Sequence, residues 1–195
     1  MLNIVIAGVG GQGTLLASKI LGQLGLNHGY DVKVSEVHGM SQRGGSVITY
    51  VRLSKEERLY SSVVEQGKAD VLLAFECLEA LRSLPYVKPG GTVIVNTQEI
   101  MPMPVITGAA KYPDGCLGQV KAKAKADVIA LDAIGIAKEC GSNKAVNTVL
   151  MGVLAKKLPF SRGQWHSAIV QNVKPEYACV NRNAFDRGYY YGENS

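Results

Sequence analysis

Short apolar segments and amphipathic segments alternate along most of the chain. Residues 2–7 form a nearly continuous apolar run, which is typical of a central parallel strand covered on both faces. Residues 14–26 carry apolar side chains at helical spacing, and residues 31–35 alternate as a second strand does. A β-branched strand follows at 46–53. This order of elements predicts an α/β domain.

The middle of the chain continues this alternation and adds turn signals. The polar residues 54–58 and the short apolar run 59–64 predict a hairpin that extends the sheet. Pro89-Gly90-Gly91 predicts a turn. The two prolines in 101–104 predict a loop or an edge piece, because proline excludes helix interiors and central strands. The remaining elements are predicted as strands at 69–75, 92–96 and 127–131 and helices at 76–84 and 133–139.

The last part of the chain is patterned differently, because its periodicity is purely helical. Helices are predicted at 146–157, 162–172 and 176–190. No repeat, low-complexity tract or linker interrupts the sequence. We therefore predict one domain over residues 1–195. Its α/β core (1–141) holds a doubly wound, mostly parallel Rossmann-like sheet, and a helical C-terminal segment (142–195) packs on that core.

A glycine-rich loop joins the first strand to the first helix. Gly8-Val9-Gly10-Gly11-Gln12-Gly13 satisfies G-x-G-x-x-G after a strand and before a helix. Gly8 permits a tight turn, Gly10 lets the backbone approach a ligand phosphate, and Gly13 lets the helix pack close to the strand. The helix N-terminus adds free N–H groups and a partial positive charge. We expect an anion or nucleotide site contacted by the backbone of Gly8, Gly10, Gly11, Gln12 and Gly13.

One interpretation of this loop is a dinucleotide-dependent enzyme. Such an enzyme places an acid after the second strand for the ribose hydroxyls, and Glu36 is the nearest candidate, slightly late. The sequence has no catalytic Tyr-x-x-x-Lys motif, and no Ser/His/Asp set is evident downstream. The glycines are equally consistent with a close strand–helix turn that binds no dinucleotide.

Composition and charge argue against several other function classes. The formal net charge is +5, but the basic residues are scattered, and the short run Lys121, Lys123 and Lys125 alternates with alanine as a solvated helix face does. Nucleic acid is therefore not an expected partner. The apolar runs are too short to span a membrane, and Met1 leads into a strand without signal-peptide features, so no membrane association is expected.

The four cysteines, Cys77, Cys116, Cys140 and Cys179, are far apart in the sequence. Zinc and iron–sulfur sites usually show close pairs such as C-x-x-C, which this sequence lacks. We expect reduced cysteines that pack as small hydrophobic residues, and no metal held by this chain. A reducing, cytoplasmic location follows from that expectation.

A second polar and glycine-rich loop follows the second strand and contains His38-Gly39-Met40-Ser41-Gln42-Arg43-Gly44-Gly45. In a doubly wound sheet it lies at the carboxyl edge, beside the first loop. His38, Ser41, Gln42 and Arg43 offer donors for a phosphate or carboxylate, and Arg43 offers a bidentate fork. Gly39 and Gly44 give the backbone freedom, so we expect this loop to line an active site. The alternative is a surface loop whose polar groups only cap helices.

The two loops together resemble a known family. The first loop and the segment Glu36-Val37-His38-Gly39-Met40-Ser41-Gln42-Arg43-Gly44-Gly45-Ser46-Val47 resemble the gamma-type domain of 2-oxoacid:ferredoxin oxidoreductases. Within that family they match best the small (beta) subunit of the indolepyruvate enzymes, because gamma subunits of the pyruvate enzymes usually lack the His-Gly-Met-Ser-Gln lead-in. The resemblance spans nearly the whole chain and includes Ala69-Asp70-Val71, Pro89-Gly90-Gly91, Asn147, Gly152, Val173-Lys174-Pro175, Asn181, Ala184-Phe185 and Gly188.

The resemblance implies the oxidative decarboxylation of a 2-oxoacid such as indolepyruvate, with coenzyme A as co-substrate and ferredoxin as electron acceptor. A thiamine site needs a Gly-Asp-Gly segment followed by an Asn pair, which this sequence lacks. Thiamine diphosphate, magnesium and the iron–sulfur clusters are therefore expected on a larger partner subunit, which would also contact ferredoxin. This chain is expected to be an accessory subunit, inactive alone. The ligand expected at its two loops is a phosphate-bearing portion of coenzyme A, or carboxylate groups at the partner interface.

Several further residues have two open interpretations. His38 is a weak candidate for acid/base chemistry and is more simply a hydrogen-bonding loop residue. His166 is expected to pack or to join an interface, and His28 to favour a helix dipole. Two more segments could contact a partner. The alternative for Tyr189-Tyr190-Tyr191 is internal packing. The alternative for Met101-Pro102-Met103-Pro104 is a plain loop.

Three other functions remain as alternatives at this stage. The first is a free-standing NAD(P)-binding Rossmann oxidoreductase, which the first loop and Glu36 would support. The second is a non-enzymatic nucleotide-binding or scaffold module. The third is an adenylating enzyme of the ubiquitin-activating type, which also uses Gly-x-Gly-Gly-x-Gly, but its paired zinc cysteines are absent from this sequence.

Overall fold

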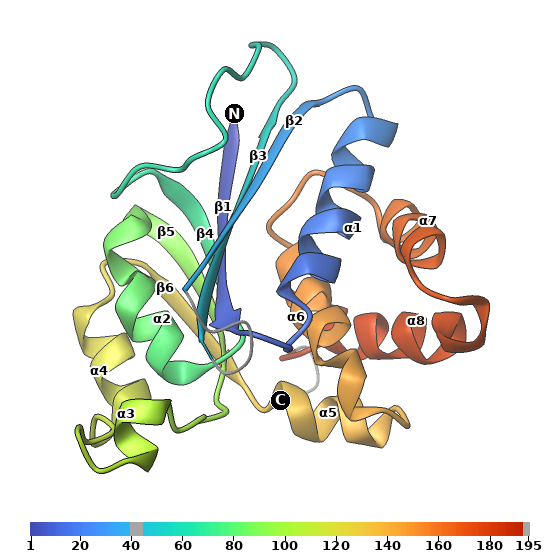
Figure 1. Ribbon diagram of the computed structural model, residues 1–195. Coiled ribbons are helices and arrows are strands. Elements are labelled where there is room, and N and C mark those ends of the chain that lie inside the picture. Colours follow the sequence, from blue (N-terminus) through green and yellow to red (C-terminus); the bar gives the residue numbers. More distant parts are fainter. Residues whose placement is uncertain (40–44, 193–195) are drawn as a thin grey trace.

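The computed structural model describes residues 1–39 and 45–192, which form a six-stranded mixed sheet with helices on both faces (Figure 1). The strands are β1 (Leu2–Val9), β2 (Asp31–His38), β3 (Ser46–Ser54), β4 (Ala69–Ala74), β5 (Val87–Asn96) and β6 (Asp127–Leu131). The helices are α1 (Thr14–Asn27), α2 (Cys77–Ser83), α3 (Met103–Ile106), α4 (Cys116–Lys123), α5 (Ala133–Glu139), α6 (Val146–Ala155), α7 (Arg162–Asn172) and α8 (Pro175–Tyr189), with 3-10 turns at Leu84–Tyr86 and Asn143–Ala145.

The strand order is β2-β3-β1-β4-β5-β6. Strands β1, β4, β5 and β6 are parallel, whereas β3 is antiparallel to both β1 and β2. As a result β2 runs in the direction of β1 but is separated from it by β3. The predicted α/β fold is confirmed, with a β2–β3 hairpin at one edge of an otherwise parallel sheet. The placement of β3 between β1 and β2 departs from the simple Rossmann order.

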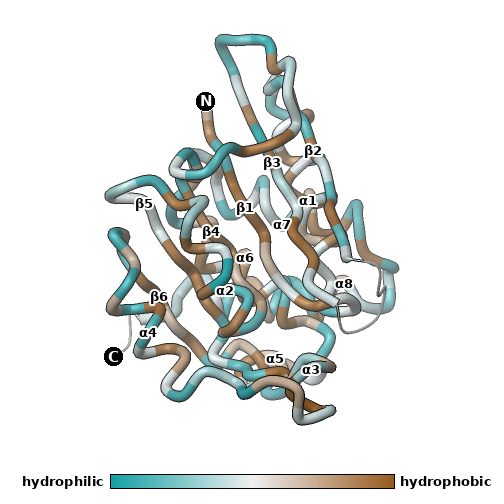
Figure 2. The backbone as a smooth tube through the Cα atoms, turned by 60° about the vertical axis from the view of Figure 1, so that its left-hand side comes forward, coloured by the Kyte–Doolittle hydropathy of each residue, from teal (hydrophilic) through white to brown (hydrophobic). Residues whose placement is uncertain are grey.

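Apolar side chains leave the central strands on both faces, as the continuous apolar runs predict. Ile4, Ile6 and Leu73 lie in the core beneath α1 and α6, while Val5 and Leu72 lie in the core on the other face, which also holds Ala80 of α2 and Val120 of α4. Figure 2 shows this concentration of hydrophobic residues in the central strands. Helices α1, α5, α6, α7 and α8 lie on one face of the sheet and α2 and α4 on the other (Figure 1).

The C-terminal helices pack on the sheet through α6, which is buried along its whole length. Helix α8 crosses α6 closely at two glycines. A Cβ on Gly152 would lie 2.1 Å from the Phe185 carbonyl oxygen, and a Cβ on Gly188 would lie 2.0 Å from the Val149 carbonyl oxygen. Only glycine permits backbones to approach this closely. The division of the chain at residues 141 and 142 stays a prediction.

Three local predictions need correction or refinement. Residues 59–64 form no strand; Leu59 and Val64 are buried as single anchors of an irregular segment, so the hairpin is β2–β3 instead. Pro89–Gly91 lies inside β5, where the pairing with β4 is irregular. The 101–104 segment leads into the single helical turn α3, because Pro104 occupies its first turn, where proline is tolerated. No helix in the described part of the chain has the length and apolar character of a membrane span.

Candidate functional site at the carboxyl edge of the sheet

The first glycine-rich loop connects the end of β1 to the start of α1. Gly11 and Gly13 have positive φ angles of 99° and 86°, which side-chain-bearing residues rarely adopt. Gly8 is glycine for a different reason, since a Cβ there would lie 3.0 Å from both Gln12 Oε1 and Thr14 Cγ2. The predicted tight, glycine-dependent turn between strand and helix is therefore present.

The Gln12 side chain holds this loop to the sheet. Its Oε1 accepts a hydrogen bond from the Val9 N–H at 2.8 Å. Its Nε2 donates to the Phe75 carbonyl oxygen at 3.1 Å and to Gln98 Oε1 at 3.3 Å. The carboxamide is therefore used inside the protein, and Gln12 can meet a ligand only through its backbone.

The N-terminus of α1 opens beside the loop without a side-chain cap. Gly13 is the N-cap residue, no side chain accepts from the first N–H groups, and the first turn holds no acidic residue. Free N–H groups and the helix dipole make such an end favourable for an anion.

The second loop lies beside the first, and its Gly45 end is hydrogen-bonded to it. Gly8 of β1 pairs in register with Val47 of β3, which pairs with His38 at the end of β2. The Gly10 N–H donates to the Gly45 carbonyl oxygen at 2.9 Å, and the Gly39 N–H donates to that of Ser46 at 3.3 Å. The predicted proximity of the two loops is thus present at their described ends. Ser41, Gln42, Arg43 and Gly44 lie outside the described residues.

A hollow of about 560 Å³ lies between the first loop, the start of α1 and the end of β2. It is lined by the backbone of the glycine loop and by Lys19, Glu36 and His38, among other residues. His38 Nδ1 lies 3.3 Å from Glu36 Oε1, and its side chain is half exposed. Glu36 also accepts from the Thr49 hydroxyl at 3.3 Å. The hollow therefore combines an anion-favouring helix end with one lysine and a His–Glu pair.

A second hollow, of about 620 Å³, lies on the opposite side of the glycine loop. Lys138, Lys144 and Asn147 line it, together with Gln98. Asn147 is 2% exposed, and its Nδ2 would lie 3.0 Å from a Cβ on Gly13. The sequence motifs gave no role to these lysines, because they come from α5 and the turn after it, far along the chain from the glycines.

The pyruvate ferredoxin/flavodoxin oxidoreductase family matches residues 3–191 of the chain. The chain belongs to this family. The indolepyruvate oxidoreductase subunit IorB of Thermococcus kodakarensis is 45% identical over 95% of this chain and 93% of its own length. The protein of the same name from Pyrococcus horikoshii is 44% identical over the same shares. The resemblance to the small subunits of the indolepyruvate enzymes is confirmed, and the chain is an oxidoreductase subunit of this family.

Solved structures show that the fold is the family's fold. The gamma subunit of a keto/oxoacid ferredoxin oxidoreductase from Geobacter sulfurreducens has a TM-score of 0.74 at 22% identity, with 100% of both chains covered. A 2-oxoglutarate:ferredoxin oxidoreductase from Magnetococcus marinus has a TM-score of 0.74 at 20% identity, over 100% of this chain but 31% of the longer one. A free-standing NAD(P)-binding oxidoreductase is not supported by these comparisons.

Two buried carboxylates, Glu76 and Glu79, lie next to the end of the second loop. Glu79 accepts from the Ser46 hydroxyl at 2.5 Å and from Arg82 at 2.7 Å, and so fixes the end of the second loop. Glu76 accepts from the backbone of Glu79 and from the Tyr112 hydroxyl. Burial, reinforced by the hydrogen bond to Glu76, raises the pKa of Tyr112. Glu76 and Glu79 are almost fully buried, so they can act on the candidate site only through the segments that they hold in place.

The other predicted candidates have structural partners. His28 Nδ1 lies 2.7 Å from the Leu24 carbonyl oxygen at the end of α1, and His166 Nε2 lies 2.7 Å from Asp186 Oδ1 between α7 and α8. Tyr189 packs against the core, while Tyr190 and Tyr191 are 43% and 40% exposed.

All four cysteines are free thiols, but they do not all pack as small hydrophobic residues. Cys77 and Cys116 are buried together, and burial, aided by their mutual hydrogen bond, raises the pKa of Cys77 to about 12. Cys179 is exposed, which corrects the expectation for that residue.

Proposed function

We propose that this chain is the accessory subunit of a thiamine-dependent indolepyruvate:ferredoxin oxidoreductase. In the proposed reaction, indolepyruvate and coenzyme A yield an acyl-CoA and carbon dioxide, and two electrons pass to ferredoxin. Identities of 45% and 44% to two indolepyruvate oxidoreductase subunits support the substrate class. The subunit works in the cytoplasm.

The observation that carries the site assignment is the contact between the two loops. The Gly10 to Gly45 hydrogen bond brings the loop ends together over the uncapped start of α1. Within this proposal, the backbone of Gly10, Gly11 and Gly13 and the side chain of Lys19 face a phosphate-bearing portion of coenzyme A. Ser41, Gln42 and Arg43 are proposed to complete the site from the second loop. Carboxylate groups at the partner interface are the alternative ligand.

The cofactors are placed on a larger partner subunit in this proposal. Among the described residues, no group of three or more His, Cys, Asp or Glu side chains is arranged to hold a metal ion. In the Magnetococcus marinus enzyme, the region with this fold makes up 31% of a longer chain. That arrangement supports the proposal that this chain works beside other domains. Thiamine diphosphate supplies the chemistry that decarboxylates the 2-oxoacid, and this chain's part is to bind and orient coenzyme A.

Reconstitution tests the proposed function directly. The chain is co-purified under anoxic conditions with its larger partner, and the complex is assayed with indolepyruvate, phenylpyruvate, pyruvate and 2-oxoglutarate. We expect activity only in the complex, with the aryl pyruvates preferred. A monomer that reduces a substrate with NADH, or a complex that prefers 2-oxoglutarate, contradicts the proposal.

The proposed ligand site is tested in the same complex by two substitutions. Lys19→Gln and Arg43→Ala are expected to raise the KM for coenzyme A and to leave the KM for the 2-oxoacid unchanged, because each removes a cation from the proposed phosphate site. Lys121→Gln, on an exposed face of α4, is the matched control. If both site variants show wild-type kinetics, coenzyme A does not bind at these loops.

A further inference from the structure

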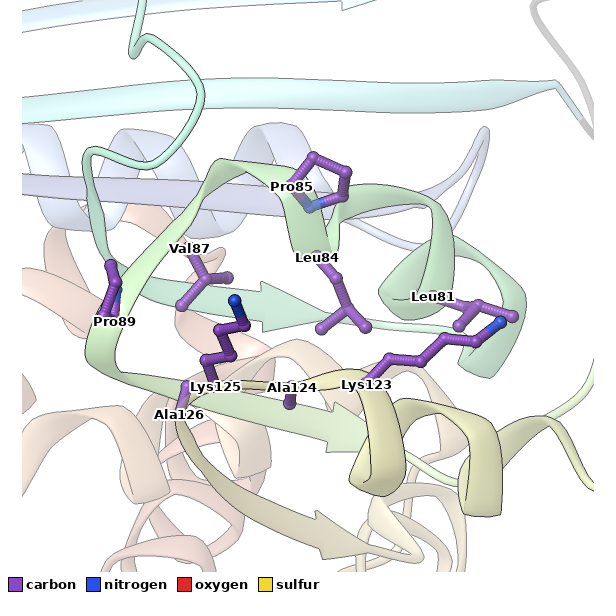
Figure 3. A pocket seen from close by; sticks show the side chains of 9 residues that line it. All are labelled: Leu81, Leu84, Pro85, Val87, Pro89, Lys123, Ala124, Lys125 and Ala126. Atoms are coloured by element: carbon purple, nitrogen blue, oxygen red, sulfur yellow. The ribbon is translucent and has the colours of Figure 1, made fainter.

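A separate hollow of about 440 Å³ lies at the opposite edge of the sheet, at the amino ends of β5 and β6. Because β1, β5 and β6 run in the same direction, this edge faces away from the glycine loop. We call it the amino-edge hollow. Its floor is apolar and includes Leu81 and Leu84, from α2 and the turn after it, and Val87 at the start of β5 (Figure 3).

Two lysines stand over this apolar floor. In Figure 3, Lys125 rises beside Val87 with its ammonium group directed into the hollow, and Lys123 extends toward Leu81. The nine lining residues include no acidic side chain, so the two positive charges are not balanced within the hollow. Lys123 donates to Gln119 Oε1 at 3.0 Å, and among the described residues no hydrogen bond or ion pair is found for the Lys125 ammonium.

Backbone hydrogen bonds hold the segment that carries the two lysines. The Gly90 N–H donates to the Lys125 carbonyl oxygen at 2.8 Å, and the Ala124 N–H donates to that of Val120 at 2.9 Å. Leu81, Leu84 and Val87 pack against the buried core on this face of the sheet. A pre-formed apolar hollow of this size with a small number of charged groups is typical of small-molecule sites.

We propose that the amino-edge hollow binds a small monocarboxylate with an apolar aryl or branched alkyl body. The body covers Leu84 and Val87, and the carboxylate pairs with the Lys125 ammonium group, which lies beside Val87 (Figure 3). Neither the glycine loop nor the second loop takes part, so this site is distinct from the proposed coenzyme A site and does not depend on it.

Binding is measured on the full chain by two-dimensional ¹H–¹⁵N NMR titration with phenylacetate. Phenylacetamide serves as a probe with the same ring but no charge, and acetate as a probe with the charge but no ring. We expect phenylacetate to bind in the millimolar range, with shifts centred on the amides of Leu84, Val87 and Ala124. Phenylacetamide is expected to bind about fivefold more weakly, and acetate to give no saturable shift.

Substitutions separate the charge from the apolar floor. Lys125→Gln is expected to weaken phenylacetate about threefold and to leave phenylacetamide unchanged, since only the carboxylate meets the ammonium. Ala124→Leu narrows the hollow and is expected to weaken both aromatic probes. Lys121→Gln, an exposed lysine of α4 just before these residues that does not line the hollow, is the matched control. Equal binding of phenylacetate and phenylacetamide, shifts centred on the glycine loop, or an unchanged affinity in Lys125→Gln overturns the proposal.

Discussion

Glycine is required for two different reasons in two regions of the molecule. At the crossing of α6 and α8, Gly152 and Gly188 have ordinary φ angles, but a Cβ on either would meet a backbone oxygen within 2.1 Å. In the first glycine-rich loop, Gly11 has a φ of 99° and nothing within 4 Å of where a Cβ would lie. The helix crossing needs glycine for space, and position 11 of the loop needs it for conformation.

Because of this difference, substitutions in the two regions are expected to change different properties of the protein. The crossing joins the helical C-terminal segment to the core, so a change there acts on the free energy of unfolding. The loop lies at the proposed ligand site, so a change there acts also on the affinity of the assembled enzyme for coenzyme A. Four pairs of substitutions, each with a matched control, test what holds the fold and what shapes the ligand site, from the largest expected effect to the smallest.

Gly188→Ala is expected to destabilise the protein by about 3 kcal/mol, because the new methyl group forces two packed helices apart. The matched control is Gly163→Ala in α7, where a Cβ would have no neighbour within 4 Å. That control is expected to be neutral or to stabilise by about 0.5 kcal/mol, since alanine favours a helix more than glycine does. Urea unfolding measures both. Equal stabilities of the two variants would contradict the close crossing.

Gln12→Ala is expected to cost about 2 kcal/mol, because it leaves the buried end of β1 with an N–H of Val9 that has lost its acceptor. Gln171→Ala is the control: it removes an exposed carboxamide that accepts from Asn27, and it is expected to change stability by less than about 0.5 kcal/mol. Gln12→Ala is also expected to raise the KM for coenzyme A, whereas Gln171→Ala leaves it unchanged. A wild-type KM in Gln12→Ala would show that loop geometry does not control the ligand site.

Much of the fold could be predicted because the central strands are covered on both faces. Runs such as 2–7 and 69–75 are nearly continuously apolar for that reason, and strands form within both. The prediction of a strand at 59–64 was wrong, because Leu59 and Val64 are buried as isolated side chains of an irregular segment. The pairing of β2 with β3 rather than β1 was not predictable, since alternation along a strand says nothing about its neighbour.

The site was predictable only where its residues lie close to a motif. The two loops meet because parallel strands bring their carboxyl ends to one edge, which the order of elements indicates. Asn147, Lys138 and Lys144 come from distant helices, and no local pattern ties them to the glycines. The family resemblance included Gly152 and Gly188 but did not explain why glycine is needed there. The close crossing of α6 and α8 explains it.

Gly11→Ala and Gly29→Ala introduce the same kind of backbone strain at two positions, of which only the first lies at the proposed ligand site. Both glycines have positive φ angles, 99° and 76°, and neither Cβ would have a neighbour within 4 Å. Each alanine variant is therefore expected to lose about 1 kcal/mol of stability by urea unfolding. Only Gly11→Ala is expected to raise the KM for coenzyme A, because Gly29 lies beyond the far end of α1. A similar rise in both variants would mean that general destabilisation, not loop geometry, affects the ligand.

Asp186→Asn is expected to have the smallest effect, and it tests the charged contacts that join α7 and α8. Partial burial opposes ionisation of Asp186, but hydrogen bonds from Arg162 and His166 outweigh it and lower its pKa. A lowered pKa in the folded state contributes stability above the ordinary value of 3.8, and the contribution is lost as the pH falls below it. We expect the variant to be less stable by about 0.5–1 kcal/mol at neutral pH.

That difference between Asp186→Asn and the wild type is measured from neutral pH to pH 3 and is expected to shrink once the pH falls below the ordinary value of 3.8, as the wild-type carboxyl also becomes neutral. Urea unfolding across this range measures it, with Asp114→Asn, at an exposed position, as the control. A difference that persists undiminished at pH 3 would show that shape rather than charge holds α7 to α8. The C-terminal helices would then depend on packing throughout, as they do at the Gly152–Gly188 crossing.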